Sequence, residues 1–280
     1  MKTIYIGVNV DWSKSFVDKN GGFYCGTTEE QKQVAAELMP HLDLTVNTTD
    51  FHSVKSKEFK KNGGMWPFHN VAEFRTINVR DLGLPENTTI SPEQTEVIEN
   101  RINKVRSGVI VPKHVYFQDG NEPAFTQELV EEAFGQRIIK PNEFLKDDFT
   151  YIISPKTHFD GTAIVSDYNL PRSVPERVPE QEYTVFDLIE TKYPKDKFNV
   201  VYVGTGVVDN ICRHYTTTGL RQKYGRRVVN IIGATTELYG IGLGFEDKKQ
   251  VRDASERIQR DIGIEHKTLD EMLEEIRSSR

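Results

Sequence analysis

The sequence contains few cysteines and no long apolar run. Only two of its 280 residues are cysteine, Cys25 and Cys212, and they lie far apart along the chain. Two cysteines are too few for a disulfide framework, and their scarcity suits a reducing compartment. No apolar stretch approaches the roughly 18 residues needed to cross a bilayer. The N-terminus also lacks the apolar region and cleavage site of a signal peptide. We therefore expect a cytoplasmic protein with no membrane partner.

An excess of basic residues is also absent. The formal net charge is −6, and lysine and arginine are dispersed along the chain. The one short basic cluster, at residues 55–61, is typical of a solvated loop. Because binding to nucleic acid depends on lysine and arginine that neutralise phosphates, we expect no nucleic-acid partner.

The chain has enough apolar residues to fold without disulfides. Apolar residues make up 37% of the sequence and charged residues 28%, which is ordinary for a globular protein. We find no internal repeat, low-complexity tract or proline-rich linker. The sequence therefore predicts one domain over residues 1–280, with insertions near 80–112 and 157–182.

Short apolar runs alternate with helical patterns along the chain. The predicted strands are Ile4–Val10, Leu44–Thr48, His114–Phe117, Thr150–Ser154, Phe198–Val203 and Arg227–Ile232. Capping motifs predict helices that begin after Ser91 and after Thr268, and a further helix carries Val251, Ala254, Ile258 and Ile262 at helical spacing. This alternation predicts an α/β fold with a doubly wound, mainly parallel sheet flanked by helices in three layers.

Polar side chains follow the ends of several predicted strands. Asp11 follows the first strand, Asp50 and His52 follow the second, and Lys156 follows the strand that ends at Ser154. The stretch GTGVVDNICRHYTTTGL, which contains Cys212, follows the strand that ends at Val203. Because parallel sheets bind ligands beyond the carboxyl ends of their strands, we expect these side chains to converge at one edge.

Cys212 lies near the start of a predicted helix, with Asp209 or a neighbour as its cap. The helix dipole and unpaired backbone amides there would stabilise a thiolate and an oxyanion. Asp11 is a candidate base for the thiol proton, and Lys156 would hold Asp11 ionised. Taken alone, Cys212 is also consistent with a small buried apolar residue, and Lys156 with a surface lysine.

The stretch DFHSVKSKEFKKNGGMWPFHN, residues 50–70, brings potential metal ligands together. Asp50, His52 and His69 offer oxygen and nitrogen ligands of the kinds that zinc, iron and manganese accept. Three such ligands, with water completing the shell, would make an open site. The spacing alone does not separate this site from a polar loop.

Four motifs follow one another along the chain: VDWSKSF, TTDFHS…GGMWPFHN, ISPKTHF and VGTGVVDNICRHYTTTGL. In this order they resemble the motifs of the nicotinamidases, within the isochorismatase-like cysteine hydrolases. The second resembles the D-x-H…W-P-x-H metal motif, which many isochorismatase-like relatives lack. The resemblance covers residues 4 to about 240 and implies the isochorismatase-like hydrolase fold.

The motifs depart from the family's pattern at four positions. Ser13 and Ser15 replace the usual Gln and Asp of the first motif. In the last motif, Asn210 stands where Asp is usual and Val208 where a smaller residue is usual. Since Ser13 and Asn210 can still form hydrogen bonds, we expect altered tuning of the site and retained activity.

The resemblance implies hydrolysis of nicotinamide to nicotinic acid and ammonia, in NAD salvage. Asp11 would deprotonate Cys212, and Lys156 would orient this pair. The thiolate would attack the carboxamide carbon, and water would hydrolyse the resulting thioester. The backbone amides of Val208 and Cys212 would form the oxyanion hole, after the family's cis peptide, here Val207–Val208.

The resemblance also implies one divalent metal ion, with zinc favoured over iron and manganese. The implied ligands are Asp50, His52 and His69, with Glu58 as a further candidate. The metal would bind the pyridine nitrogen of nicotinamide and orient the ring, while Phe16 and Trp66 would form aromatic walls. The resemblance further implies self-association, although no stretch of the sequence indicates an interface.

Two other functions remain open at this point. One is a related cysteine amidohydrolase acting on another small amide or a carbamoyl compound, and the other is a non-catalytic metal-binding homologue. A dinucleotide-binding oxidoreductase is disfavoured, because the glycines at 204–206 and 240–244 do not give G-x-G-x-x-G between a strand and a helix.

Overall fold

A parallel sheet forms the centre of the molecule. The computed structural model describes residues 1–17, 19, 23–50, 58–60, 63–67, 91–92, 151–156, 158–163, 184–239 and 247–280. The strands are β1 (Lys2–Val10), β2 (Leu44–Asp50), β3 (Tyr151–Lys156), β4 (Phe198–Gly206), β5 (Arg227–Ile231) and β6 (Glu265–Lys267). They form a six-stranded sheet in the order β3-β2-β1-β4-β5-β6, with every pairing parallel. This order is doubly wound, as predicted.

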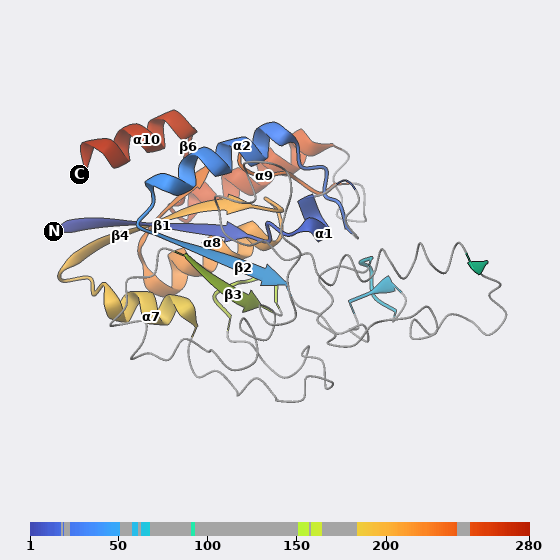
Figure 1. Ribbon diagram of the computed structural model, residues 1–280, viewed down its shortest axis with the longest axis horizontal. Coiled ribbons are helices and arrows are strands. Elements are labelled where there is room, and N and C mark those ends of the chain that lie inside the picture. The colour runs from blue at the N-terminus through green and yellow to red at the C-terminus, as the bar shows by residue number, and fades with distance from the viewer. Residues whose placement is uncertain are drawn as a thin grey trace.

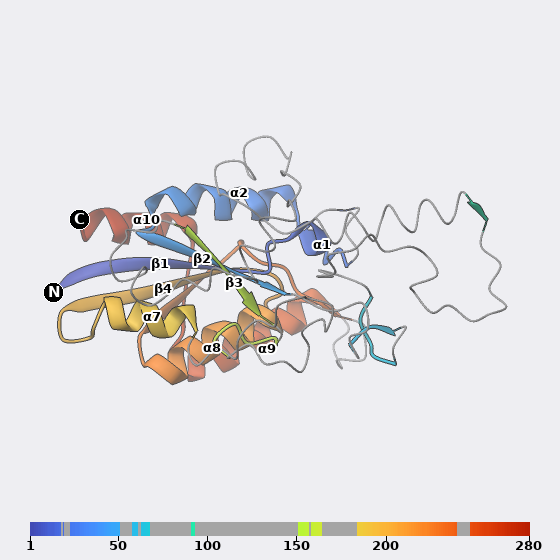
Figure 2. The same cartoon turned by 60° about the horizontal axis from the view of Figure 1, so that its bottom comes forward.

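Helices cover both faces of the sheet. The helical segments are α1 (Lys14–Val17), α2 (Glu29–Leu38), η1 (Met39–His41), α7 (Val185–Lys192), α8 (Cys212–Tyr224), α9 (Lys248–Asp261) and α10 (Leu269–Ser278). Helices α2 and α10 lie on one face, and α7, α8 and α9 lie on the other (Figures 1 and 2). The three predicted layers are therefore confirmed. None of the helices described is long and apolar enough to cross a membrane.

Five of the six predicted strands are confirmed. The central strands β1 and β4 are each buried over seven consecutive residues, which explains their continuous apolar sequences. Strands β2 and β3 run further than predicted, to Asp50 and Lys156. The predicted strand His114–Phe117 lies outside the described residues. The sequence did not predict β6, because its three residues, EHK, carry no apolar pattern.

The insertions and the predicted helix after Ser91 fall almost wholly outside the described residues. Only residues 91–92 of the first insertion and 158–163 of the second are described. The prediction of one domain over residues 1–280 therefore stays a prediction. The capping box of α10 is confirmed, because Thr268 and Glu271 bond reciprocally to each other's backbone N–H.

The predicted apolar stripe of α9 is only partly correct. Val251 is buried, but Ile258 is 49% exposed. The buried face instead continues through Ser255 and Gln259. These polar residues are buried because they find hydrogen-bond partners on other elements, which a pattern of apolar residues does not reveal.

A buried polar network joins α9 to the sheet. The Gln259 side chain accepts from Asn230 Nδ2 at 2.9 Å and donates to Ser255 Oγ at 2.9 Å. His266 Nε2 lies 2.7 Å from Gln259 Oε1 and carries a proton, because an amide oxygen only accepts. Ser255 Oγ in turn donates to the carbonyl oxygen of Asp209, 3.1 Å away, just before α8. The network therefore fixes the loop that leads into α8.

Protonation of His266 should destabilise the fold. Burial, together with the charges of Arg213 and Arg260, lowers the pKa of His266 to about 4 from an unfolded value of 6.5, although Asp209 opposes the shift. The contribution of neutral His266 is complete above pH 6.5 and is lost as the pH falls toward 4. Since the side chain is partly exposed, we expect a loss of about 1–2 kcal/mol.

Urea denaturation of the wild type and of His266→Gln at pH 7.5 and 4.5 measures this effect. The variant keeps a donor toward Gln259 and should lose less stability between the two pH values. An identical pH dependence in the wild type and His266→Gln would contradict the prediction.

Candidate functional site

The candidate site lies where the strand order reverses, between β1 and β4. Ligands of doubly wound sheets bind at this point, outside the carboxyl ends of the strands. Val10 and Gly206, the last residues of the two strands, are paired in register. Gly206 has a φ of 111°, and a Cβ there would lie 2.1 Å from the carbonyl oxygen of Val10. Only glycine allows the two strand ends to approach this closely.

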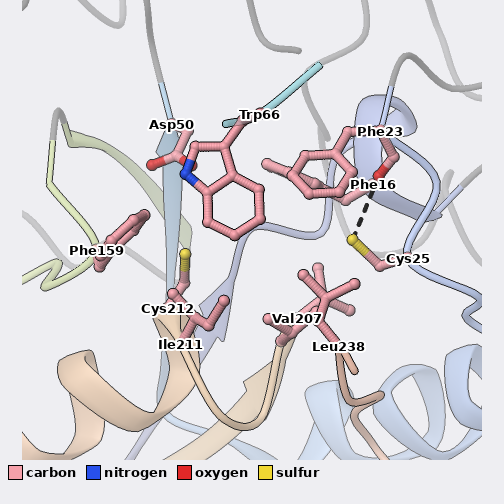
Figure 3. Close-up of a pocket in the computed structure, with 11 residues that line it drawn as sticks. Phe16, Phe23, Cys25, Asp50, Trp66, Phe159, Val207, Ile211, Cys212 and Leu238 are labelled. Atoms are coloured by element: carbon pink, nitrogen blue, oxygen red, sulfur yellow. Dashed lines mark hydrogen bonds between the residues drawn. The ribbon is translucent and has the colours of Figure 1, made fainter. Parts of the chain in front are cut away.

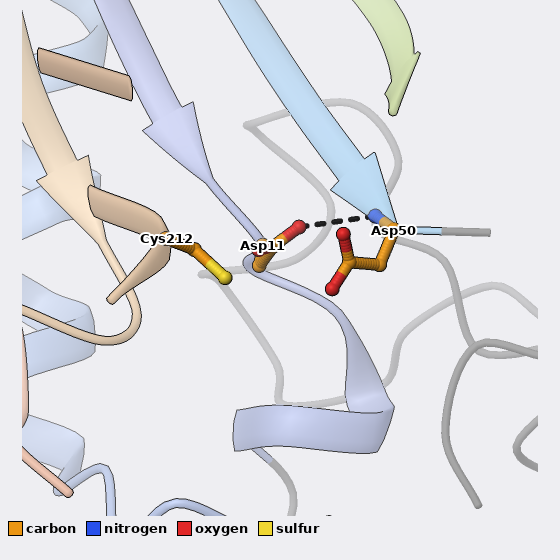
Figure 4. A group of neighbouring side chains, drawn as sticks. All are labelled: Asp11, Asp50 and Cys212. Atoms are coloured by element: carbon orange, nitrogen blue, oxygen red, sulfur yellow. Dashed lines mark hydrogen bonds between the residues drawn. The ribbon is translucent and has the colours of Figure 1, made fainter. Parts of the chain in front are cut away.

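Asp11 is held rigidly at the end of β1. It is fully buried and has a φ of 54°, a left-handed conformation that few residues other than glycine adopt. Its N–H donates to the carbonyl oxygen of Thr48 at 2.9 Å. Its Oδ1 accepts from the Asp50 N–H at 3.0 Å (Figure 4). Backbone and side chain are therefore both tied to β2.

Lys156 connects the two carboxylates. The register of β2 and β3 pairs Asp50 with Lys156. Lys156 Nζ lies 2.8 Å from Asp11 Oδ2 and also forms an ion pair with Asp50 Oδ1. All three side chains are at most 5% exposed. The structure thus confirms that residues from the ends of three strands converge.

Burial and neighbouring charges shift the pKa values of this group. Burial, reinforced by the charge of Asp50, raises the pKa of Asp11 to about 7, against the opposing effect of Lys156. Burial opposes the charge on Lys156, but the two carboxylates prevail and raise its pKa well above the usual value. Asp11 therefore exchanges protons near neutral pH, while Lys156 stays charged.

Cys212 is the first residue of α8 and lies against Asp11. The potential metal-binding atoms of Asp11, Asp50 and Cys212 lie within 4.8 Å of one another (Figure 4). Burial raises the pKa of the Cys212 thiol well above its usual value, and the carboxylates add to this shift while Lys156 opposes it. The resting side chain is therefore a thiol that faces a base.

The loop between β4 and α8 contains the cis peptide Val207–Val208, at the position that the family resemblance predicted. The carbonyl oxygen of Val208 accepts from the N–H groups of Ile211 and Arg213, both at 3.1 Å. In the part of the chain that the structure describes, the N–H groups of Val208 and Cys212 donate to no protein acceptor. Two backbone donors beside the thiol thus remain for a ligand oxygen.

The predicted cap of α8 is wrong. Ile211 occupies the N-cap position, where it makes no side-chain cap. The carboxylate of Asp209 instead forms a buried ion pair with Arg213, which also donates to the carbonyl oxygen of Ile231 at 3.2 Å. An arginine one turn away provides a charged partner for this carboxylate, and pairing the two offsets their burial better than a single backbone N–H would.

A pocket opens beside Cys212, and its space, including the part open to solvent, is about 340 Å³ (Figure 3). It is lined by Phe16, Phe23, Cys25, Asp50, Trp66, Phe159, Val207, Val208, Ile211, Cys212 and Leu238. The structure places Phe16 and Trp66 in this lining, where the sequence predicted pocket walls. Among the residues that line it, Asp50 alone carries a charge.

Two aromatic walls and a second cysteine of the pocket were not predicted from the sequence. The ring of Phe23 lies 5.8 Å from that of Phe16 and 5.4 Å from that of Trp66. Phe159 meets Trp66 edge-on at 6.5 Å. Phe159 comes three residues after Lys156, a candidate catalytic residue. This closeness in the sequence could have indicated that Phe159 lies at the site. Phe23 and Cys25 carried no such signal.

The predicted metal ligands are only partly visible in the structure. Asp50 lines the pocket, whereas His52 and His69 lie outside the described residues. Glu58 is half-buried, and its carbonyl oxygen accepts from the N–H of Trp66 at 3.0 Å. The backbone of Glu58 therefore pairs with that of Trp66, which is a wall of the pocket. This position keeps Glu58 a candidate ligand.

The cluster of Asp11, Asp50 and Cys212 is a poor metal site by itself. The ammonium of Lys156 already contacts both carboxylates and supplies the positive charge that their burial requires. A divalent ion bound to Asp50 would therefore need ligands beyond these three residues. Histidine nitrogens, such as those of the predicted set, have the right chemistry.

Neither a family model nor a curated protein sequence matches the chain. Solved structures do match. A nicotinamidase/pyrazinamidase from Acinetobacter baumanii has a TM-score of 0.53 and 10% identity, covering 97% of this chain and 99% of that one. A cysteine hydrolase from Pseudomonas syringae pv. phaseolicola has a TM-score of 0.51 and 12% identity, covering 99% and 93%. PnC1 from L. infantum, in complex with nicotinate, has a TM-score of 0.50 and 14% identity, covering 95% and 93%. The chain therefore has the same fold as these three proteins.

Proposed function

We propose that the protein hydrolyses the carboxamide of a small, flat, largely apolar amide, with nicotinamide as its substrate. The observation that carries this proposal is the meeting of Asp11, Lys156 and the Cys212 thiol at one end of an apolar pocket. A nucleophile beside a base, with a third group that orients the base, is the arrangement needed for covalent catalysis.

The geometry supports a two-step reaction. Asp11, whose pKa of about 7 suits a general base, takes the proton of Cys212, and the thiolate attacks the carboxamide carbon. The N–H groups of Val208 and Cys212 stabilise the oxyanion. The C–N bond then breaks, and Asp11 returns its proton to the departing ammonia. Water hydrolyses the thioester, which releases the carboxylic acid and restores the thiol.

The residues that line the pocket favour a flat and neutral substrate. Four of its lining residues are aromatic, and rings gain energy from stacking and edge contacts. Lys156 is not among the lining residues, so its ammonium is not placed to bind a free carboxylate in the pocket. Nicotinamide meets these requirements, and PnC1 from L. infantum, which has this fold, was solved with nicotinate.

The proposal includes one divalent metal ion, with zinc favoured over iron and manganese. Asp50, His52 and His69 would hold it, with Glu58 as a further candidate. When bound, it would coordinate the ring nitrogen and orient the ring. A carbamoyl substrate lacks this ring nitrogen, and another small amide stays open as an alternative substrate. Location in the cytoplasm and self-association remain predictions.

The two pocket cysteines provide a matched test of the nucleophile. Cys212→Ser should lower the rate of ammonia release from nicotinamide by roughly 10⁴–10⁶-fold, because the nucleophile is lost. Cys25→Ser keeps a donor toward the Phe23 carbonyl oxygen, 3.2 Å away, and should retain turnover. Ammonia release by the two purified variants measures the difference. Undiminished hydrolysis by Cys212→Ser would refute the assignment of the nucleophile.

Removal of the predicted histidine ligands should remove the metal. We expect His52→Ala and His69→Ala to lower the metal-to-protein ratio in elemental analysis, and turnover to fall with it. These variants test metal binding more specifically than Asp50→Ala, because Asp50→Ala would also deprive Lys156 of an ion-pair partner. His158→Ala, at an exposed position, is the control and should keep its metal. An unchanged ratio in both ligand variants would rule out the assigned site.

A further inference from the structure

The pocket wall formed by Phe159 is attached to the helix that carries Cys212. Phe159 belongs to the short segment 158–163 that follows β3 and Lys156. Its ring meets Trp66 on one side and stacks on Tyr215 of α8 at 6.1 Å on the other. Phe159 is nevertheless 39% exposed, so ring contacts alone bury it incompletely. Figure 3 shows Phe159 and Trp66 beside the Cys212 thiol.

Thr216 makes the polar connection between this segment and α8. Its hydroxyl accepts from the Gly161 N–H at 2.9 Å and donates to the carbonyl oxygen of Phe159 at 3.3 Å. The Thr216 side chain is fully buried. Since Thr216 lies one helical turn after Cys212, one rigid helix positions both the thiol and the backbone of Phe159.

Close packing at Gly219 supports the same attachment. A Cβ at Gly219 would lie 2.5 Å from Thr162 Oγ1 and 2.8 Å from both carboxylate oxygens of Asp160. Asp160 Oδ1 is itself fixed by the N–H of Thr162 at 2.8 Å and its hydroxyl at 2.7 Å. The segment is therefore ordered within itself and lies directly on the surface of α8.

We propose that Thr216 is a positioning residue that sets the pocket's selectivity for a flat ring, by holding Phe159 opposite Trp66. This inference rests on the proposed function and deepens it. Thr216 does not contact the reacting atoms, so its effect should fall on ring binding and spare the chemistry of Cys212. The neighbouring Thr217 is a matched control, because it is equally buried but bonds to the Arg213 carbonyl oxygen at 2.8 Å within α8.

The test compares Thr216→Val, Thr216→Ser and Thr217→Val with the wild type. Thr216→Val keeps the shape but loses both hydrogen bonds to the segment. We expect its KM for nicotinamide to rise roughly tenfold, with kcat nearly unchanged. Alkylation of Cys212 by iodoacetamide, a probe without a ring, should keep its rate, as located by peptide mass mapping. Thr216→Ser, which retains the hydroxyl, should restore the wild-type KM.

Hydrogen exchange measures how firmly the segment 158–163 is held on α8, independently of turnover. The Gly161 amide should exchange faster in Thr216→Val and at the wild-type rate in Thr217→Val. Phe159→Leu should raise KM as Thr216→Val does, and the double variant should show no further rise, because both changes remove the same wall. Additive effects of the two changes would contradict the proposal.

Failure of this inference and failure of the proposed function give different results. Faster Gly161 exchange with an unchanged KM would overturn the role of Thr216 and leave the hydrolase proposal standing. So would a fall in kcat and in the alkylation rate that accompanies the rise in KM. A wild type that hydrolyses no nicotinamide would contradict the proposed substrate. The Kd of nicotinamide, which is then bound without turnover, for the wild type and Thr216→Val would decide the role of Thr216: a higher Kd in the variant supports the role and an equal Kd overturns it.

Discussion

The site depends on one buried ammonium group. Asp11 and Asp50 lie next to a thiol in a region that excludes water, where two uncompensated carboxylates would be strongly destabilising. Lys156 contacts both and balances part of their charge. This arrangement requires β3 beside β2 and β2 beside β1, because each strand supplies one of the three charged groups. The strand order is therefore a condition for the chemistry of Cys212.

In the proposed reaction, the same ammonium leaves Asp11 able to act as a base. Burial raises the pKa of Asp11 and Lys156 lowers it, and the balance lies near neutral pH. The thiol, buried at the start of α8, gives up its proton only to a partner in contact with it. The charged groups at the strand ends and the N–H groups of Val208 and Cys212 thus both lie beside the thiol.

The ring pocket is built differently from the charged group. Its charged neighbours come from strand ends fixed by sheet register, whereas its aromatic walls come from segments that pack against one another through rings. Phe159 reaches the pocket because Thr216 and Gly219 hold its segment on α8. Phe23 reaches it through contacts with Phe16 and Trp66. Under the proposed function, selectivity for the ring can therefore change while the charged group stays intact.

Continuous apolar runs mark the buried strands and show where they stop, so five strands and the polar residues at their ends could be predicted from local patterns. Asp11, Lys156 and Cys212 could be identified in this way. The pairing of these groups depends on how the strands and helices pack together. The Asp209 carboxylate pairs with Arg213 and does not cap α8. Phe159 lines the pocket. Such choices depend on distances between segments remote in sequence, and no local pattern of residues encodes those distances.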